Sequence, residues 1–348
     1  MTTFFRQYKF SILIILIGIL TYFTYPRYIH IKGQSMGTTY EIKAYKRFFF
    51  TQKSLASLID KRLTKILGQV SHYEKDSQLS QFNRGPKGRP MTVGDDFWAI
   101  IKTSERLYND TEGLWDPTAE PLIAAWGFSS AGRVETPPSQ LKLNRLLDKV
   151  GFRFIYLYPK QQVEKKKDAL RLNFAAIAKG YAVDAIAELL ESQEIDRYYV
   201  EIGGEVRVGT SKSEKNPWRL GIQDPRDTKL GALYGVVSLE NKAMATSGDY
   251  RQFFEWKGKR YNHVMNAKTG WPSDNGVVSV TVIANTCMLA DGLATAIMIL
   301  GPEKGLALLT KYPHTDALIL QDHPSGVKAI QSPGFKRYLN DKQGLKNE

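Results

Sequence analysis

Residues 169–202 read ALRLNFAAIAKGYAVDAIAELLESQEIDRYYVEI, and the fold class follows from this stretch and its neighbours. The alternation of apolar residues over 169–174 predicts a short strand, and the run from Ile177 to Ser192 predicts a helix. The residues 198–202 predict another strand. A strand, a turn and a helix in this order commonly present backbone N–H groups to a phosphate.

Mostly helical patterns precede this stretch, and mostly sheet patterns come after it. Before it we expect two strands, at 36–45 and 152–158. We also expect three helices: one over 54–70 with Ser54 as its N-cap, one from Asp95 to just before Gly113, and one between Ser139 and Gly151. After it, further short β-rich runs separated by Gly, Pro and Asn predict strands at 217–222, 232–240, 250–256, 260–265 and 277–284. Helices at 288–300 and 302–311 and a buried strand at 317–320 complete the pattern.

These elements predict an α+β fold, with mixed or antiparallel sheets flanked by helices in one compact domain. The turns between elements are short and no repeat is visible, which favours a single unit. We expect Lys165, Lys166 and Lys167 to form a solvated turn between two strands.

An apolar segment precedes the domain. Residues 10–25, FSILIILIGILTYFTY, carry no charge, and Pro26 ends the run. At about 1.5 Å per residue they extend about 24 Å, a little short of the roughly 30 Å hydrocarbon core. Arg6 and Lys9 come first, which favours a cytoplasmic amino terminus and export of the chain beyond the segment.

The segment is either a signal anchor or a cleaved signal peptide, and its bulky end favours the anchor, because cleavage sites need small residues. We therefore expect the protein in the inner (cytoplasmic) membrane, with the domain that follows the segment on the periplasmic, extracytoplasmic side. The expected layout is a cytoplasmic 1–9, a transmembrane helix at 10–25, a linker at 26–34, the domain at 35–341 and a tail at 342–348.

Charge and cysteine content exclude several classes of protein. The net charge is +13, but residues 1–47 hold seven Lys or Arg against one Glu, which leaves +7 for the other 301 residues. With no recognised binding motif beside it, this charge does not indicate a nucleic-acid partner. Cys287 is the only cysteine, so a lipoprotein, an internal disulfide and a cysteine-rich metal site are excluded. We expect it to be a small buried residue.

Asp291 and Thr295 form a candidate cation site. They lie four residues apart in the apolar run MLADGLATAIMIL, so a helix places them on one face. Carboxylate and hydroxyl oxygens suit Mg²⁺, which often shares its coordination shell with substrate phosphates. The alternative is an Asp favoured by the helix dipole beside a Thr bonded to its own helix.

Lys179 stands in the first turn of the helix predicted from Ile177, where the helix dipole disfavours a positive charge. A bound phosphate would offset this, and the alternative is a surface lysine beside Asp184. Gly180 inside a helix indicates close packing or close approach of a ligand. His263 follows a β run and precedes a turn, so it is a candidate for proton transfer or a structural histidine.

Seven segments, taken in order, resemble the ApbE family, the FAD:protein FMN transferases. They span nearly the whole chain after the apolar segment: SMGTTY at 35–40, WDPTAEPL at 115–122, AIAKGYAVD at 176–184, EIGGEV at 201–206, ATSGDY at 245–250, HVMNAKTGWP at 263–272 and ADGLATA at 290–296. Any one of these motifs is weak, and their common order makes the resemblance specific.

The resemblance implies a set of ligand contacts. Mg²⁺ would be held by the carbonyl of Ala176 and the side chains of Asp291 and Thr295. FAD, as substrate, would be contacted at Met36, Tyr73, Leu114, Trp115, Asp116, Asn173, Lys179 and Val264. Two positions depart from the family pattern, since many members have Asp at Asn173 and Asp-Pro at Asn266-Ala267.

The resemblance also implies the reaction, which is Mg²⁺-dependent transfer of FMN from FAD to a Thr or Ser hydroxyl of an exported protein, such as a redox subunit of the Nqr or Rnf type, with release of AMP. His263 is the candidate base for the attacking hydroxyl, and Asp116 is the reserve. Two alternatives are an exported FAD pyrophosphatase that gives FMN and AMP, and a flavin-binding protein without catalysis.

Overall fold

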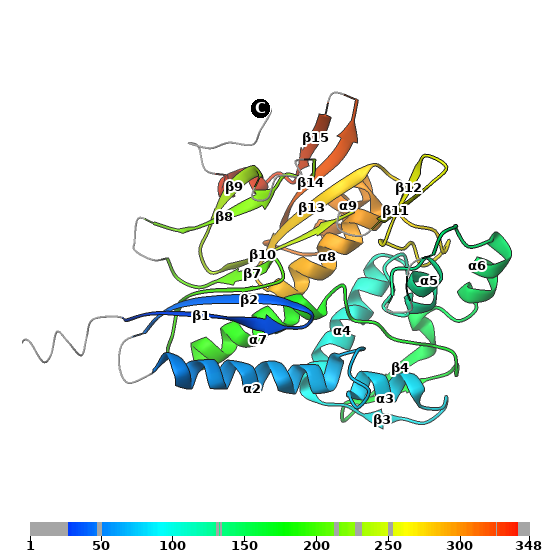
Figure 1. The fold of residues 1–348 in the computed structure, drawn as a ribbon, viewed down its shortest axis with the longest axis horizontal. Coiled ribbons are helices and arrows are strands. Elements are labelled where there is room, and N and C mark those ends of the chain that lie inside the picture. The colour runs from blue at the N-terminus through cyan, green and yellow to red at the C-terminus, as the bar shows by residue number, and fades with distance from the viewer. Residues whose placement is uncertain are drawn as a thin grey trace, which may run out of the picture.

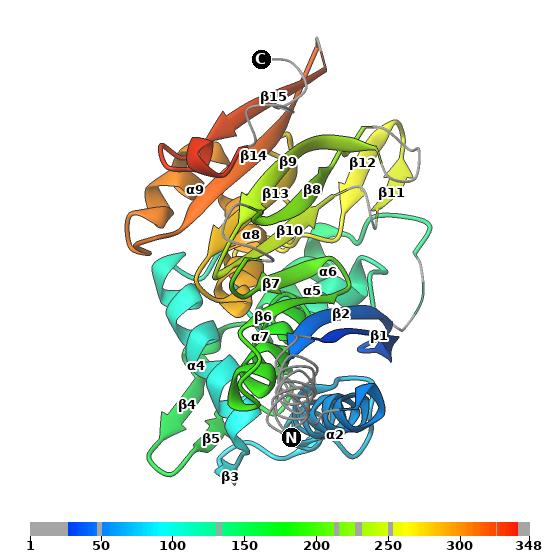
Figure 2. The ribbon, with the colours of Figure 1, turned by 90° about the vertical axis from the view of Figure 1, so that its left-hand side faces the viewer.

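A computed structural model describes residues 27–46, 51–129, 132, 134–211, 216–226, 232–249, 253–324 and 326–339. Its main feature is an eight-stranded antiparallel sheet in the order β1-β2-β6-β7-β10-β13-β14-β15 (Figures 1 and 2). These strands are β1 (Arg27–Ser35), β2 (Thr38–Lys46), β6 (Arg197–Ile202), β7 (Glu205–Val208), β10 (Lys242–Gly248), β13 (Val277–Ala284), β14 (Asp316–His323) and β15 (Gly326–Gln331). The α+β prediction is confirmed.

Helices cover one face of this sheet in two layers. The helices α7 (Ala178–Ser192) and α8 (Cys287–Leu300) pack directly on β6, β7, β10 and β13. Outside them lie α2 (Gln52–Val70) and α4 (Asp95–Asp110), which contact α7 and α8 respectively (Figure 1). One continuous apolar core joins the sheet to all four helices.

A second apolar cluster covers the opposite face, where β8 (Trp218–Gln223), β9 (Leu233–Leu239) and the 3₁₀ helix η2 (Phe335–Tyr338) pack. Because β13 is covered on both faces, all eight of its residues are buried. The other elements are α3 (Gln78–Arg84), β3 (Met91–Thr92), α5 (Glu120–Ala125), α6 (Gln140–Leu147), η1 (Phe152–Phe154), β4 (Ile155–Tyr158), β5 (Gln162–Lys165), β11 (Phe253–Trp256), β12 (Lys259–Asn262) and α9 (Pro302–Leu309).

Three expectations about local structure are wrong. The segment 26–34 is not a linker, because Arg27–Ser35 forms the edge strand β1 and buries Ile29 and Ile31. The N-cap of α2 is Thr51, whose hydroxyl accepts a hydrogen bond from the Ser54 N–H at 3.1 Å. Residues 169–174 do not form a strand, because a side chain takes the place of a neighbouring strand. The side-chain amide of Asn83 donates to the Leu172 carbonyl and accepts from the Leu172 N–H, both at 2.8 Å.

The lysine run is also not a solvated turn. The hairpin between β4 and β5 turns at Lys160 and Gln161, which have φ of 59° and 54°. Lys165 therefore lies in β5 with only 1% of its surface exposed, and its ammonium donates to the carbonyl of Asn83 at 2.8 Å. Burial lowers the pKa of Lys165 to about 8.

Within the described ranges, no helix is both long and apolar enough to cross a bilayer. The membrane segment predicted at 10–25 lies outside the described residues, as does the tail at 342–348. Cys287 is buried, as expected.

Candidate active site

A cavity of about 390 Å³ opens beside the helices α5, α7 and α8 and the strand β10. Ten of the residues predicted to act in catalysis or binding line it: Tyr73, Trp115, Asp116, Asn173, Ala176, Lys179, His263, Val264, Asp291 and Thr295. The other two, Met36 and Leu114, do not line it and pack against the main apolar core. Segments as far apart in sequence as Tyr73 and Thr295 thus share one cavity.

Close packing of α7 against α8 positions Asp291. A Cβ atom on Gly180 would lie 2.4 Å from the carbonyl oxygen of Cys287, so only glycine permits this approach. The Gly180 N–H then donates to Oδ2 of Asp291 at 3.0 Å. The expectation of close packing at Gly180 is confirmed, and the carboxylate, 5% exposed, is aimed at the start of α7.

Thr295 lies one turn further along α8, and its hydroxyl is 3.0 Å from the Ser247 hydroxyl on β10. The neighbouring residues Thr246 and Gly248 also line the cavity. Sequence reasoning missed β10 as a strand, and only the ATSGDY motif pointed to this segment.

The turn before α7 brings Ala176 to the same cavity. The side-chain oxygen of Asn173 accepts a hydrogen bond from the Ala175 N–H at 2.8 Å, and the Ile177 N–H donates to the Phe174 carbonyl at 3.0 Å. These bonds shape the turn on which Ala176 sits, next to the helix that carries Lys179.

The donor set fits Mg²⁺. Asp291, Thr295 and Ala176 line one cavity, and a carboxylate, a hydroxyl and a backbone carbonyl are the kinds of hard oxygen ligand that this ion prefers. No group of three or more His, Cys, Asp or Glu side chains that could hold a metal occurs in the part of the chain that the structure describes. Three oxygen ligands from the protein suit an ion that completes its coordination shell with water and phosphate oxygens, as Mg²⁺ does.

Lys179 is paired with Glu205 on β7, with 2.5 Å between Nζ and Oε1. Its side chain is 29% exposed and that of Glu205 only 3%. Asp184 is not its partner, because that carboxylate accepts hydrogen bonds from the N–H groups of Cys287 and Met288 at the start of α8. Lys179 therefore places a positive charge at the cavity wall beside the Ala176 turn.

Asp116 joins its own loop to the start of η1. Its carboxylate accepts hydrogen bonds from the Thr118 N–H at 2.8 Å, the Thr118 hydroxyl at 2.6 Å and the Phe152 N–H at 3.0 Å. Burial raises its pKa, and these hydrogen bonds oppose the shift. Because both oxygens already accept hydrogen bonds, this geometry favours a structural role for Asp116 over a role as base.

His263 is half-buried, and its ring lies 6.3 Å from that of Phe128, centroid to centroid, across the cavity wall. The side chain of Asn262 accepts a hydrogen bond from the Val264 N–H at 3.0 Å and so fixes the turn that presents His263. On another side, His72 lies against the exposed Tyr73, with 3.9 Å between ring centroids. Sequence reasoning did not single out His72, whose pKa is lowered by burial.

The departure at Asn266-Ala267 keeps a tight turn. The Asn266 side chain accepts a hydrogen bond from the Lys268 N–H at 3.0 Å. The Ala267 N–H donates to the Leu114 carbonyl at 3.2 Å, a bond that proline cannot make. In this chain the HVMNAKTGWP segment is thereby tied to the segment that carries Trp115.

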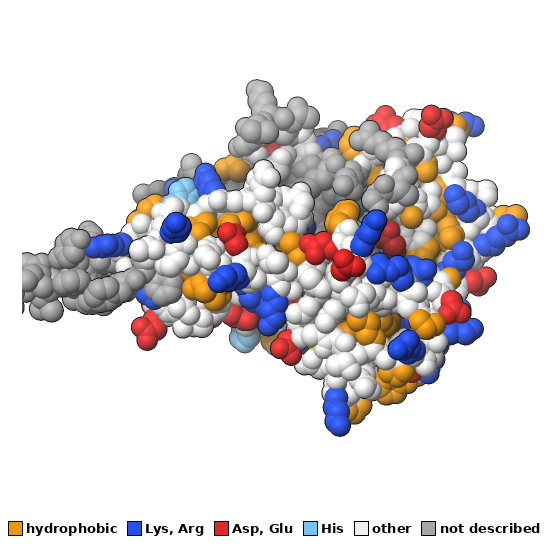
Figure 3. Space-filling model, turned by 60° about the horizontal axis from the view of Figure 1, so that its bottom comes forward, with side chains coloured by type: hydrophobic (Ala, Val, Ile, Leu, Met, Phe, Trp, Pro, Cys, Tyr) orange, Lys and Arg blue, Asp and Glu red, His pale blue; other side chains and the backbone are white. Residues whose placement is uncertain are grey.

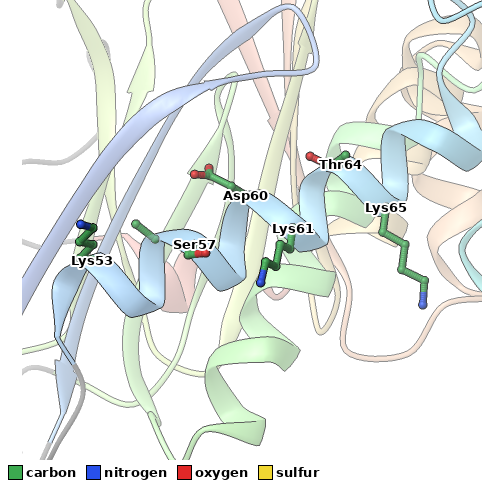
Figure 4. Close-up of a pocket in the computed structure, with 7 residues that line it drawn as sticks. Lys53, Ser57, Asp60, Lys61, Thr64 and Lys65 are labelled. Carbon is green, nitrogen blue, oxygen red and sulfur yellow. The ribbon is translucent and has the colours of Figure 1, made fainter.

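A second hollow lies on the outer surface of α2 and has no role in this site. It is lined by Lys53, Ala56, Ser57, Asp60, Lys61, Thr64 and Lys65, all from one helix (Figure 4). None of the predicted site residues contributes to it. On the face shown in Figure 3, the Lys and Arg side chains of the described residues are interspersed with Asp and Glu.

Comparison with known proteins gives a consistent result. Residues 36–319 match the model of the ApbE family. A FAD:protein FMN transferase of Vibrio cholerae is 36% identical over 90% of this chain and 93% of its own length. A FAD:protein FMN transferase of Haemophilus influenzae is 35% identical over 90% of this chain and 92% of its own length.

Solved structures show the same likeness. The flavin transferase ApbE from Vibrio cholerae matches with a TM-score of 0.82 and 36% identity, over 90% of this chain and all of that one. The apo form of the Pseudomonas stutzeri flavinyl transferase ApbE also has a TM-score of 0.82, with 32% identity over 90% of this chain and 98% of that one.

Proposed function

The chain belongs to the ApbE family, and from this premise we propose that it is a transferase that moves FMN from FAD to a Thr or Ser hydroxyl of an exported protein and releases AMP. One observation carries the proposal. Ala176, Lys179, Asp291 and Thr295 meet in one cavity, where hard oxygen ligands lie beside a positive charge. A dinucleotide's pyrophosphate needs both a cation and a basic side chain.

The proposed reaction is a displacement at the FMN-side phosphorus of FAD. The acceptor oxygen forms a bond to this phosphorus, the bond from phosphorus to the bridging oxygen breaks, and AMP leaves with that oxygen. Bound Mg²⁺ would neutralise the pyrophosphate and stabilise the charge on the leaving group. Ala176, Asp291 and Thr295 are the residues that would hold it.

The chain's own groups have separate tasks in this scheme. Lys179, held by Glu205, would orient the pyrophosphate and oppose its charge. His263 would accept the proton of the attacking hydroxyl, which is a poor nucleophile while protonated. Asp116 remains the reserve base, although its three hydrogen bonds favour a role in shaping the wall.

The site of action is part of the proposal. The charge-free run at 10–25 and the preceding Arg6 and Lys9 support an anchor in the inner membrane with the domain on the periplasmic side. There the enzyme would meet exported acceptors, including redox subunits of the Nqr or Rnf type.

The test is incubation with FAD, Mg²⁺ and a candidate acceptor domain, followed by intact mass. We expect the acceptor to gain one FMN residue and one AMP to appear per transfer. AMP released equally fast without acceptor would instead identify a pyrophosphatase, and tight FAD binding with no turnover would identify a binding protein.

Two histidine variants refine the test. We expect His263→Asn to lower kcat by roughly 100-fold, the usual contribution of a general base, with a smaller change in KM. The matched control is His314→Asn, which alters an exposed histidine at φ 60° that Asn also tolerates. A wild-type rate in His263→Asn would remove His263 from the mechanism.

A further inference from the structure

Glu120 is a cavity residue that the predicted site does not include. It is the first residue of α5, is partly buried and lines the cavity together with Asn173. Burial raises its pKa, and a hydrogen bond from the Asn173 side chain opposes the shift. A carboxylate brought into a cavity in this way needs a hydrogen-bonding partner.

The orientation of the Asn173 amide is set by its surroundings. Its oxygen accepts a hydrogen bond from the Ala175 N–H at 2.8 Å, so its nitrogen faces Glu120 and donates to Oε2. The Asn173 N–H donates to the Pro117 carbonyl at 2.7 Å, which fixes the backbone as well. Glu120 is therefore held in place by a residue that is itself held at three points.

The other carboxylates that line the cavity are engaged with the protein. Asp116 accepts two hydrogen bonds from Thr118 and one from the Phe152 N–H, Glu205 pairs with Lys179, and Asp291 accepts from Gly180. At Glu120 the contact to Asn173 occupies one oxygen, and a carboxylate offers about four acceptor positions. Glu120 is also partly exposed, whereas Asp116, Glu205 and Asp291 are all buried. It is thus the carboxylate best placed to meet a donor on a bound ligand.

Resting on the proposed function, we propose that Glu120 is a substrate-binding residue that accepts a hydrogen bond from a hydroxyl or ring N–H group of the bound dinucleotide. Asn173 is its positioning residue. FAD offers such donors on both halves, the ribityl and isoalloxazine groups of FMN and the ribose and amino groups of AMP.

The arrangement makes an exchange of roles possible. Asn173→Asp alone would place two carboxylates in contact, and both cannot stay ionised at that distance. In the double variant Glu120→Gln/Asn173→Asp the amide and the carboxylate change places, so the contact and the net charge are kept.

The experiment measures the dissociation constant of FAD for the full chain by flavin fluorescence, without acceptor. We expect Glu120→Gln and Asn173→Asp each to weaken binding by roughly tenfold or more, as for loss of a hydrogen bond to a charged group. We expect the double variant to bind FAD more tightly than Asn173→Asp but no more tightly than Glu120→Gln, since the amide–carboxylate contact returns while the charged acceptor at position 120 stays lost. FMN and AMP titrated separately identify the half of FAD that contacts Glu120.

Controls separate this role from a purely structural one. Glu303→Gln alters another glutamate in the first turn of a short helix, outside the cavity, and should leave FAD binding unchanged. Thermal unfolding of every variant checks the fold. Unchanged binding in Glu120→Gln, or a double variant no better than Asn173→Asp, overturns the inference. A wild type that binds FAD but transfers nothing overturns only the proposed function, whereas one that binds no FAD overturns both.

Discussion

At the scale of single residues, Asp291 serves both the fold and the proposed chemistry. One oxygen accepts a hydrogen bond from Gly180 and ties α8 to α7. The same carboxylate lines the cavity with Thr295 and Ala176. Substitutions at this position must therefore distinguish loss of the hydrogen bond from Gly180 from loss of the negative charge.

Asp291→Asn keeps an oxygen for the Gly180 N–H but removes the charge. We expect a normal unfolding temperature and a transfer rate lowered by roughly 100-fold or more, since a bound cation contributes several kcal/mol. Asp291→Ala should lose the activity and also about 1–3 kcal/mol of stability, because a buried N–H is left without its acceptor.

Thermal unfolding and transfer assays over a series of Mg²⁺ concentrations measure both effects. Asp95→Asn, at an exposed site in the first turn of α4, is the control. A wild-type rate for Asp291→Asn in Mg²⁺ would refute the ligand role.

At the scale of elements, the crossing of α7 and α8 positions the site. The two helices touch where Gly180 meets Cys287, and Asp184 caps the first turn of α8. Asp291 lies one turn later along the same helix. Small changes at this crossing should therefore alter both stability and ligand binding.

Gly180→Ala tests the crossing. Its Cβ would meet backbone, which cannot rotate away, so we expect a loss of roughly 1–3 kcal/mol and a higher KM for FAD. The matched control is Gly68→Ala in α2, where a Cβ meets nothing within 4 Å and stability should rise by up to about 1 kcal/mol. Equal effects of the two substitutions on unfolding would contradict the packing argument.

The buried end of β5 gives a prediction about pH. Lys165 has a pKa of about 8 in the fold and about 10.4 when unfolded. Between these values the unfolded chain binds more protons, so this residue makes stability rise with pH. Relative to Lys165→Met, the wild type should gain up to about 2 kcal/mol between pH 7 and 9.5.

Denaturant unfolding of both proteins at the two pH values measures this gain. At pH 7 the Lys165→Met variant should have a free energy of unfolding close to that of the wild type. It no longer has a charge to bury, but it leaves the Asn83 carbonyl without its hydrogen-bond donor. A pH-independent difference between the two proteins would mean that Lys165 keeps its ordinary pKa.

At the scale of the whole molecule, the eight-stranded sheet begins with β1, directly after the residues proposed to anchor the chain. Ile29 and Ile31 place β1 in the core, and its nine residues all pair with β2. The domain therefore includes residues that sequence patterns assigned to a linker. A truncation should therefore remove the anchor without unfolding the domain only if it leaves β1 intact.

Two truncations test this. A chain that begins at Arg27 should leave the membrane fraction and keep its unfolding temperature and transfer activity. A chain that begins at Met36 should lose several kcal/mol, because two buried isoleucines at about 1.5–3 kcal/mol each are removed. Membrane fractionation and thermal unfolding are the measurements, and a membrane-bound Arg27 chain would refute the proposed anchor.

The sequence by itself determined the features that depend on local spacing. The helices α2, α4, α7 and α8 follow from apolar residues repeated every three to four positions, and the Asp291–Thr295 pair follows from the same period. Charges and a short apolar run also led to the prediction of an anchor at 10–25, which lies outside the described residues. The strand β10 escaped this reasoning, since Ala, Ser and Gly in KAMATSG have low strand propensity yet let α8 pack closely.

Only the tertiary structure decided which distant groups meet. Gly180 and Asp291 are 111 residues apart in sequence, and Asn173 and Glu120 are 53 apart. No periodic pattern encodes such pairs, because they depend on how helices and sheet pack after each has formed. Packing alone therefore paired Lys179 with Glu205, brought the Phe152 N–H to Asp116 and placed Glu120 in the cavity.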